Sequence, residues 1–127
     1  MTFIQGDVRD LHCLDQIFQN YPIDAVIHFA GLKAVGESQQ IPLEYFDHNI
    51  SASIQLTQAM QKAEVFKLVF SSSATVYGES NPSPLIEDMS TGLPTNNYGY
   101  TKLIIEQLLE KNFNCRLALV YCFASIF

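Results

Sequence analysis

The chain has 127 residues, of which 48% are hydrophobic and only 16% charged, and its formal net charge is −6. This composition excludes a disordered tail and predicts one globular domain over residues 1–127. The acidic balance argues against a nucleic-acid-binding protein, and no apolar stretch reaches the roughly 20 residues that cross a bilayer. Cys13, Cys115 and Cys122 lack CxxC spacing. They are expected to be reduced thiols, and with no signal-like N-terminus they indicate a cytoplasmic protein.

The first part of the chain alternates between strand-like and helix-like patterns. Residues 2–5 predict a short strand that runs into Gly6 and Asp7. Asp10 is a suitable N-cap for a helix that Pro22 ends, because its apolar positions fall on one face. Residues 25–31 predict a buried strand that finishes on a glycine. The apolar positions of the helix are Leu11, Leu14, Ile17 and Phe18.

The second part continues the alternation. Residues 43–63 predict a long helix with two apolar stripes, which indicates two buried faces. A strand over 66–70, a proline-rich loop over 78–97, a helix over 98–111 and a strand over 116–123 complete the pattern. The two stripes are Phe46, Ile50 and Ile54, and Leu56, Ala59, Met60 and Ala63.

The order of these elements is β-α-β-α-β-loop-α-β. Strands that alternate with helices, and that are apolar throughout, predict a parallel sheet covered by helices on both faces. The predicted fold class is therefore α/β. In such sheets ligands bind beyond the carboxyl ends of the strands.

Three predicted strands end in residues that suit a ligand site. They end in Gly6-Asp7, in Phe29-Ala30-Gly31 and in Ser71-Ser72-Ser73. A carboxylate can accept hydrogen bonds from a base or a ribose, and a glycine allows the backbone to approach a ligand closely. Taken singly, each of these residues also suits an ordinary turn.

Tyr98 and Lys102 form a more specific pair. Four residues apart on a helix, their side chains lie on one face within reach of each other. A neighbouring ammonium stabilises a phenolate, so Tyr98 would be usable as a general base near neutral pH. An ordinary surface pair, or an ion pair between Lys102 and Glu106, would also explain the spacing.

Three motifs together resemble a known family. Ser-Ser-Ser-Ala-Thr-Val-Tyr-Gly at 71–78 and Tyr-Gly-Tyr-Thr-Lys at 98–102 are similar to the extended short-chain dehydrogenase/reductase family. Phe-Ala-Gly-Leu-Lys-Ala-Val-Gly-Glu-Ser at 29–38 narrows the resemblance to the UDP-glucose 4-epimerases. The match runs from Gly6 to about Leu109 and implies a Rossmann-like, doubly wound parallel sheet.

The resemblance implies a mechanism for interconverting UDP-galactose and UDP-glucose in galactose metabolism. Tyr98 would take the proton from the sugar 4-hydroxyl while hydride passes to NAD, and the 4-keto sugar would then turn over. Ser73 would hydrogen-bond the reacting oxygen, and Lys102 would support Tyr98 and hold the nicotinamide ribose. The implied substrate contacts are Lys33, Ser73 and Tyr98.

The resemblance also implies cofactor contacts and a partner. His48 or Asn49 would lie near the pyrophosphate, with the choice between them open. A homodimer would form through the helices at 43–63 and 98–111. The implied NAD contacts are Asp7, Val8, Phe29, Ala30, Gly31, Leu32, Lys33, His48, Asn49, Ser71, Tyr98, Lys102 and Phe123.

The sequence also departs from the family pattern. None of its six glycines forms the GxxGxxG turn that binds pyrophosphate, so a partial Rossmann domain without the first two strands and without the C-terminal substrate lobe is expected. Ala124 stands where the family has a sugar-nucleotide asparagine. His12 and His28 have no acidic or cysteine partners at ligand spacing, so both are predicted to be structural and no metal site is expected.

Other interpretations remain at this point. The related 4,6-dehydratases need an acidic pair after the strand-end hydroxyl residue, and Ala74 and Thr75 stand there instead. The chain could also be an inactive truncated remnant that folds poorly or associates with a full-length homologue. An unrelated α/β binding module is a third alternative.

Overall fold

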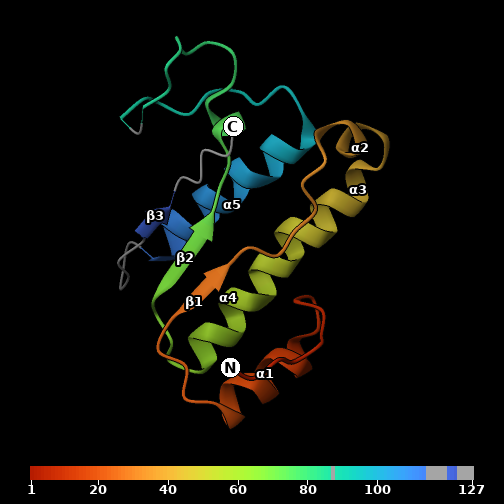
Figure 1. The fold of residues 1–127 in the computed structure, drawn as a ribbon, viewed down its shortest axis with the longest axis vertical. Coiled ribbons are helices and arrows are strands. Elements are labelled where there is room, and N and C mark those ends of the chain that lie inside the picture. The colour runs from red at the N-terminus through yellow and green to blue at the C-terminus, as the bar shows by residue number, and fades with distance from the viewer. Residues whose placement is uncertain (87, 114–119, 123–127) are drawn as a thin grey trace.

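The computed structural model describes residues 1–86, 88–113 and 120–122, and its ribbon is drawn in Figure 1. Helices α4 and α5 run alongside a small sheet, and α1 packs at one end of α4. The elements in chain order are α1 (Leu11–Asn20), β1 (Val26–His28), α2 (Val35–Gln40), α3 (Pro42–Tyr45), the π-helical turn η1 (Phe46–Ser51), α4 (Ala52–Lys62), β2 (Leu68–Ser71), the 3₁₀ turn η2 (Ala74–Tyr77), α5 (Asn97–Phe113) and β3 (Val120–Cys122).

Among the described residues, the sheet has three parallel strands in the order β1-β2-β3. Val26 pairs with Leu68 on one side of β2, and Val69 pairs with Val120 on the other. Parallel pairing confirms the predicted α/β class, because parallel strands need crossover connections, which helices supply. The predicted strand residues 116–119 and 123 lie outside the described residues.

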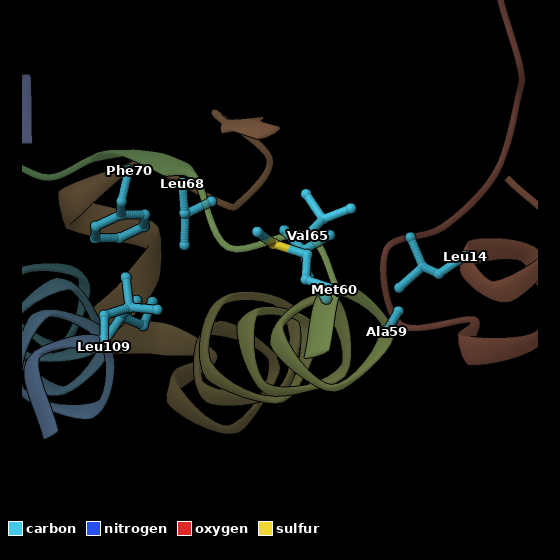
Figure 2. Packing of buried hydrophobic residues seen from close by; sticks show 9 residues of the cluster. Leu14, Ala59, Met60, Val65, Leu68, Phe70 and Leu109 are labelled. Atoms are coloured by element: carbon cyan, nitrogen blue, oxygen red, sulfur yellow. The ribbon is translucent and has the colours of Figure 1, made fainter. Parts of the chain in front are cut away.

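The hydrophobic core lies between one face of the sheet and helices α4 and α5. In Figure 2, the side chains of Phe70 and Leu68 extend from β2 toward Leu109 of α5, and Met60 and Val65 lie beside Leu68. Fully burying side chains of this size contributes about 1.5–3 kcal/mol each. The cluster consists of Leu14, Leu56, Ala59, Met60, Val65, Leu68, Phe70, Ile105 and Leu109.

The opposite face of the sheet is open at β1. The side chain of Ile27 is 62% exposed, whereas its neighbour His28 is buried. The prediction of a sheet covered on both faces is therefore wrong at this strand, since alternating strand residues point to opposite faces and only one face meets α4 and α5. The strand is also shorter than predicted, because it spans only Val26–His28.

Residues 2–5 do not form the predicted strand. Phe3 is 87% exposed there, and Ile4 is exposed as well. A strand is stable only where a neighbouring strand satisfies its backbone groups. None of the strands in the described ranges lies beside this segment, so its apolar pattern has no sheet to join.

The predicted helices are confirmed, with changes at their ends. Asp10 caps α1 by accepting hydrogen bonds from the backbone N–H groups of His12 and Cys13 at 3.0 and 3.1 Å. The predicted long helix is present as a continuous helical run from α3 through η1 to α4. Helix α2 and turn η2 were not predicted. No helix in the described parts of the chain is long and apolar enough to cross a membrane.

Candidate functional site

The strand ends border a cleft. Phe29 follows β1 and Ser71 ends β2, and because the two strands are parallel, the residues after them meet at one edge of the sheet. The cleft has a volume of about 750 Å³. It is lined by Phe29, Gly31, Leu32, Lys33, Ser71, Ser72, Ser73, Ala74, Thr75, Ser83, Pro84, Leu85, Tyr98 and Lys102.

The first turns of α5 bring Tyr98 and Lys102 to this cleft. Lys102 Nζ donates a 2.8 Å hydrogen bond to the carbonyl oxygen of Ser71. The same nitrogen lies 4.7 Å from the centroid of the Phe70 ring and 5.9 Å from that of Tyr98. The predicted helical pair therefore meets the end of the serine-ended strand, and both of its side chains line the cleft.

Lys102 is buried although it is basic. Removal from water disfavours its charged form and lowers its pKa to about 8, and the carboxylate of Glu106 partly opposes that change. A lysine with this pKa can change charge close to neutral pH. Lys102 is therefore a buried residue of the cleft lining. A solvated surface lysine, which was one alternative from the sequence, does not describe it.

Ser73 is the N-cap residue of η2 and lines the same cleft. Its hydroxyl oxygen accepts hydrogen bonds from Thr75 N at 3.3 Å and Thr75 Oγ1 at 2.9 Å. This local capping orients the side chain before any ligand binds. Ser73 was predicted from the sequence as a site residue, whereas Thr75, which orients it, was not.

The turn after β1 depends on a glycine and a buried asparagine. Gly31 has a φ of +150°, and a Cβ there would come within 2.8 Å of Asn49 Oδ1. Asn49 Oδ1 accepts from Leu32 N at 2.8 Å, and its Nδ2 donates to Leu32 O and Thr101 Oγ1, both at 3.0 Å. Asn49 thus ties this wall of the cleft to α5.

The two candidates on η1 differ in their surroundings. Asn49 is buried against the turn after β1, whereas His48 is half-buried and close enough to Asp7 to help lower its pKa. The side-chain amide of Asn49 already bonds to protein groups. Its position therefore supports a role in shaping the cleft.

Asp7 lines a second, more open cavity of about 770 Å³. Hydrogen bonds from Arg9 are the main cause that lowers the pKa of Asp7 to about 2. Arg9 also reaches Asp47 on η1, with 2.6 Å between Nη1 and Oδ2. Val8 packs against the hydrophobic core instead of facing this cavity.

The predicted site residues thus fall into separate groups. Those around the strand ends and α5 line one cleft, and Asp7 lines the second cavity. Ala30 is exposed on the turn between Phe29 and Gly31. Phe123 and Ala124 lie outside the described residues.

Gly99 and Glu106 are two residues near the cleft to which the sequence analysis gave no functional role. A Cβ at Gly99 would lie 2.8 Å from Thr75 Oγ1 and 3.0 Å from Pro94 Cβ, so α5 approaches η2 closely only because this position has no side chain. Glu106 is buried one turn after Lys102. The glycine inside the 98–102 motif was a usable sequence signal for this close approach. The burial of Glu106 could not be predicted in the same way, because it depends on tertiary packing.

His28, at the end of β1, has a structural environment. It is buried, its Nε2 lies 3.0 Å from Ser53 Oγ, and its ring centroid is 5.7 Å from that of Phe70. Burial, assisted by the charge of Lys102, lowers the pKa of His28 to about 4. The folded protein therefore holds this imidazole neutral at neutral pH.

This depressed pKa predicts an acid sensitivity. Because the folded pKa of His28 lies below its unfolded value near 6.5, the unfolded chain binds the additional proton as pH falls, and stability decreases between pH 6.5 and 4. We expect His28 to lower the free energy of unfolding by about 2 kcal/mol between pH 7 and 5. Urea unfolding of the wild type and His28→Gln at both pH values measures this difference.

The exposed His12 provides the matched control. The variant His12→Gln should lose stability with falling pH as the wild type does, whereas His28→Gln should lose about 2 kcal/mol less. Equal pH dependence in all three proteins would contradict the burial of a neutral His28.

Comparisons with known proteins agree with this geometry. The sequence profile described as the NAD dependent epimerase/dehydratase family matches residues 1–124. The chain is 53% identical over 105 residues to a UDP-glucose 4-epimerase of Yersinia pestis, covering 83% of this chain and 31% of that protein. It is 52% identical over 110 residues to the UDP-glucose 4-epimerase of Bacillus subtilis, covering 87% and 32%.

Solved structures show the same fold. The UDP-glucose 4-epimerase of Bifidobacterium longum in complex with NAD⁺ and UDP aligns with a TM-score of 0.88 and 45% identity, over 93% of this chain and 35% of that chain. That of Stenotrophomonas maltophila, with bound NAD and formylated UDP-arabinopyranose, aligns with a TM-score of 0.86 and 52% identity, over 94% and 35%. The chain therefore spans about a third of the length of the relatives that it matches.

Proposed function

This chain belongs to the NAD dependent epimerase/dehydratase family, and we propose that it carries the catalytic part of an enzyme that interconverts UDP-galactose and UDP-glucose. The observation that carries the proposal is the single cleft in which Tyr98, Lys102 and Ser73 converge beyond the strand ends. Relatives at 52–53% identity are UDP-glucose 4-epimerases, which supports this substrate class.

The cleft fits the nicotinamide-ribose half of NAD. The absence of a side chain at Gly31 lets the backbone of this wall pack against Asn49 Oδ1, and the Lys102 ammonium reaches the same cleft as a hydrogen-bond donor. The proposed contacts in this cleft are Phe29 to Lys33, Ser71, Tyr98 and Lys102, while Asp7 is proposed to contact the adenine from the second cavity. When bound, NAD supplies a reversible acceptor for hydride.

The residues of this chain have distinct roles in the proposed mechanism. Tyr98 Oη takes the proton from the 4-hydroxyl of the sugar and later returns it. Lys102 places positive charge near the Tyr98 ring while it is held by the Ser71 carbonyl, so the phenolate is stabilised electrostatically. Ser73, oriented by Thr75, hydrogen-bonds the reacting oxygen. Lys33 is proposed to contact the substrate from the wall of the cleft.

We also propose that the enzyme is a cytoplasmic homodimer that pairs through the helical run at 43–63 and the helix at 98–111. Support comes from apolar side chains that stay exposed on both segments. Leu43 is 82% exposed, and Ile54 and Tyr100 are also exposed. The free thiol of Cys13 is consistent with a reducing compartment.

A chimera tests the proposed activity. The roughly 110 residues that align with the Bacillus subtilis relative replace the corresponding segment of that protein. We expect the purified chimera to convert UDP-galactose to UDP-glucose, measured by NADH formation with UDP-glucose dehydrogenase as the coupling enzyme. The unmodified Bacillus subtilis protein is the positive control. A chimera that folds cooperatively and binds NAD but does not turn over UDP-galactose would overturn the proposal.

A further inference from the structure

Glu106 is a buried acid next to the cleft, and the mechanism above does not use it. It lies one helical turn after Lys102 on the same face of α5, and only 9% of its surface is exposed. Its Oε1 is buried and forms no hydrogen bond of good geometry with the described residues. Buried carboxyl groups are rarely left in this state, because losing water costs an ionised group several kcal/mol.

Ser72 connects this acid to the cleft. Ser72 directly follows β2 and lines the cleft. Like Glu106 Oε1, its buried Oγ lacks a hydrogen bond of good geometry within the described ranges. Burial raises the pKa of Glu106, while the neighbouring Ser72 hydroxyl and the Lys102 ammonium oppose that rise. Both of these opposing groups line the cleft.

Lys102 needs such a neighbour. Within the described residues, its ammonium has one hydrogen bond, to a neutral carbonyl, and a contact with the Phe70 ring. These contacts do not replace the water that a buried ammonium loses. In the part of the chain that the structure describes, the other titratable groups around the pair are His28, Tyr98 and Glu110, and burial holds His28 neutral above its pKa of about 4. Glu106 is the described acid whose charge favours the charged form of Lys102.

We propose that Glu106 is a positioning residue for the Tyr98–Lys102 pair: its buried carboxylate, one turn from Lys102 on the same face of α5, keeps the Lys102 ammonium charged where it meets the Ser71 carbonyl. The proposal rests on the proposed function for its catalytic meaning. The charge of Lys102 itself can be measured without turnover. Glu106 acts through Lys102 and does not contact the substrate.

The direct test is a pH titration of Lys102 in the 127-residue chain. Lysine is labelled with ¹³C at Cε, the Lys102 resonance is assigned by its loss in Lys102→Arg, and its chemical shift is followed with pH. We expect Glu106→Gln to lower the titration midpoint of Lys102 by about 1 pH unit, because the nearby negative charge is gone. Glu106→Asp keeps the charge at a greater distance and should give a smaller decrease.

Glu110→Gln is the matched control, since Glu110 is exposed one further turn along α5. It should leave the Lys102 midpoint unchanged within about 0.3 pH unit. An unchanged midpoint in Glu106→Gln, or equal shifts in Glu106→Gln and Glu110→Gln, would overturn the proposal. If Glu106→Gln does not fold, Glu106→Asp decides the question by the same measurement.

The chimera supplies the second readout. In Glu106→Gln the alkaline limb of the kcat/KM profile for UDP-galactose should move about 1 pH unit lower, because Lys102 loses its proton at lower pH. A purely structural role would instead reduce activity equally at all pH values. An inactive wild-type chimera would count against the proposed function alone, since the titration of Lys102 still tests the role of Glu106.

Discussion

Replacing Tyr98 by phenylalanine in the chimera is expected to lower kcat for UDP-galactose about 1000-fold, the range in which general acid–base groups contribute. Tyr98 lines the cleft with its ring near the Lys102 ammonium, and the substitution removes only the hydroxyl that exchanges the proton. The ring contacts remain, so KM and the unfolding midpoint should change little. Steady-state kinetics with the coupled assay, together with thermal unfolding, measure both effects.

Tyr100 is a matched control for this substitution. It lies two residues further along α5, is 40% exposed, and its ring centroid is 6.5 Å from that of Phe46, away from the residues that line the cleft. Tyr100→Phe removes the same hydroxyl group from the same helix and should retain full activity. If Tyr98→Phe retained activity within tenfold of the wild type, Tyr98 would not be the base.

The variant Gly99→Ala is expected to cost about 1–3 kcal/mol of stability, the usual effect of adding a methyl group to a close-packed contact. The new Cβ would lie 2.8 Å from Thr75 Oγ1, the atom that donates to Ser73 Oγ. To relieve this contact, η2 must move away from α5, and Ser73 loses its orientation. We therefore expect a loss of kcat as well as of stability, since misplacing a catalytic contact by about 1 Å can cost about 100-fold in rate.

Gly36 offers the matched control for the glycine substitution. It lies within α2, and a Cβ there would meet no atom within 4 Å. Gly36→Ala should therefore keep activity and leave stability unchanged or raise it by up to about 1 kcal/mol, because alanine favours helix. Urea unfolding of both variants of the chain, and kinetics of both chimeras, make the comparison. Equal stability of Gly99→Ala and the wild type would show that η2 and α5 are not in close contact.

Local patterns were sufficient to predict several elements. The cap at Asp10, the apolar face of α1 and the glycine or serine residues after β1 and β2 are all properties of short segments, and the structure contains them. The pairing of Tyr98 with Lys102 could also be predicted, because helical geometry places residues four apart on one face. These features depend on sequence neighbours, so no knowledge of distant contacts was needed.

Other features were predicted incorrectly or not at all, because they depend on what lies nearby in space. Residues 2–5 have the pattern of a strand, yet no described strand pairs with them. Ile27 is as apolar as Val26, yet it points to the face of β1 that none of the described helices covers. A hydrophobic pattern shows that a segment can be buried, but the partner that buries it is decided by the tertiary structure.

The sequence by itself determined the α/β class, the helix and strand periodicities and the residue types available for the chemistry. Only the tertiary structure decided that Lys102 is held by the Ser71 carbonyl, that Thr75 orients Ser73 and that Glu106 is buried. The physical reason is that periodicity and capping act over a few residues of sequence. Desolvation, charge coupling and close approach depend on distances between segments that the chain brings together only when it folds.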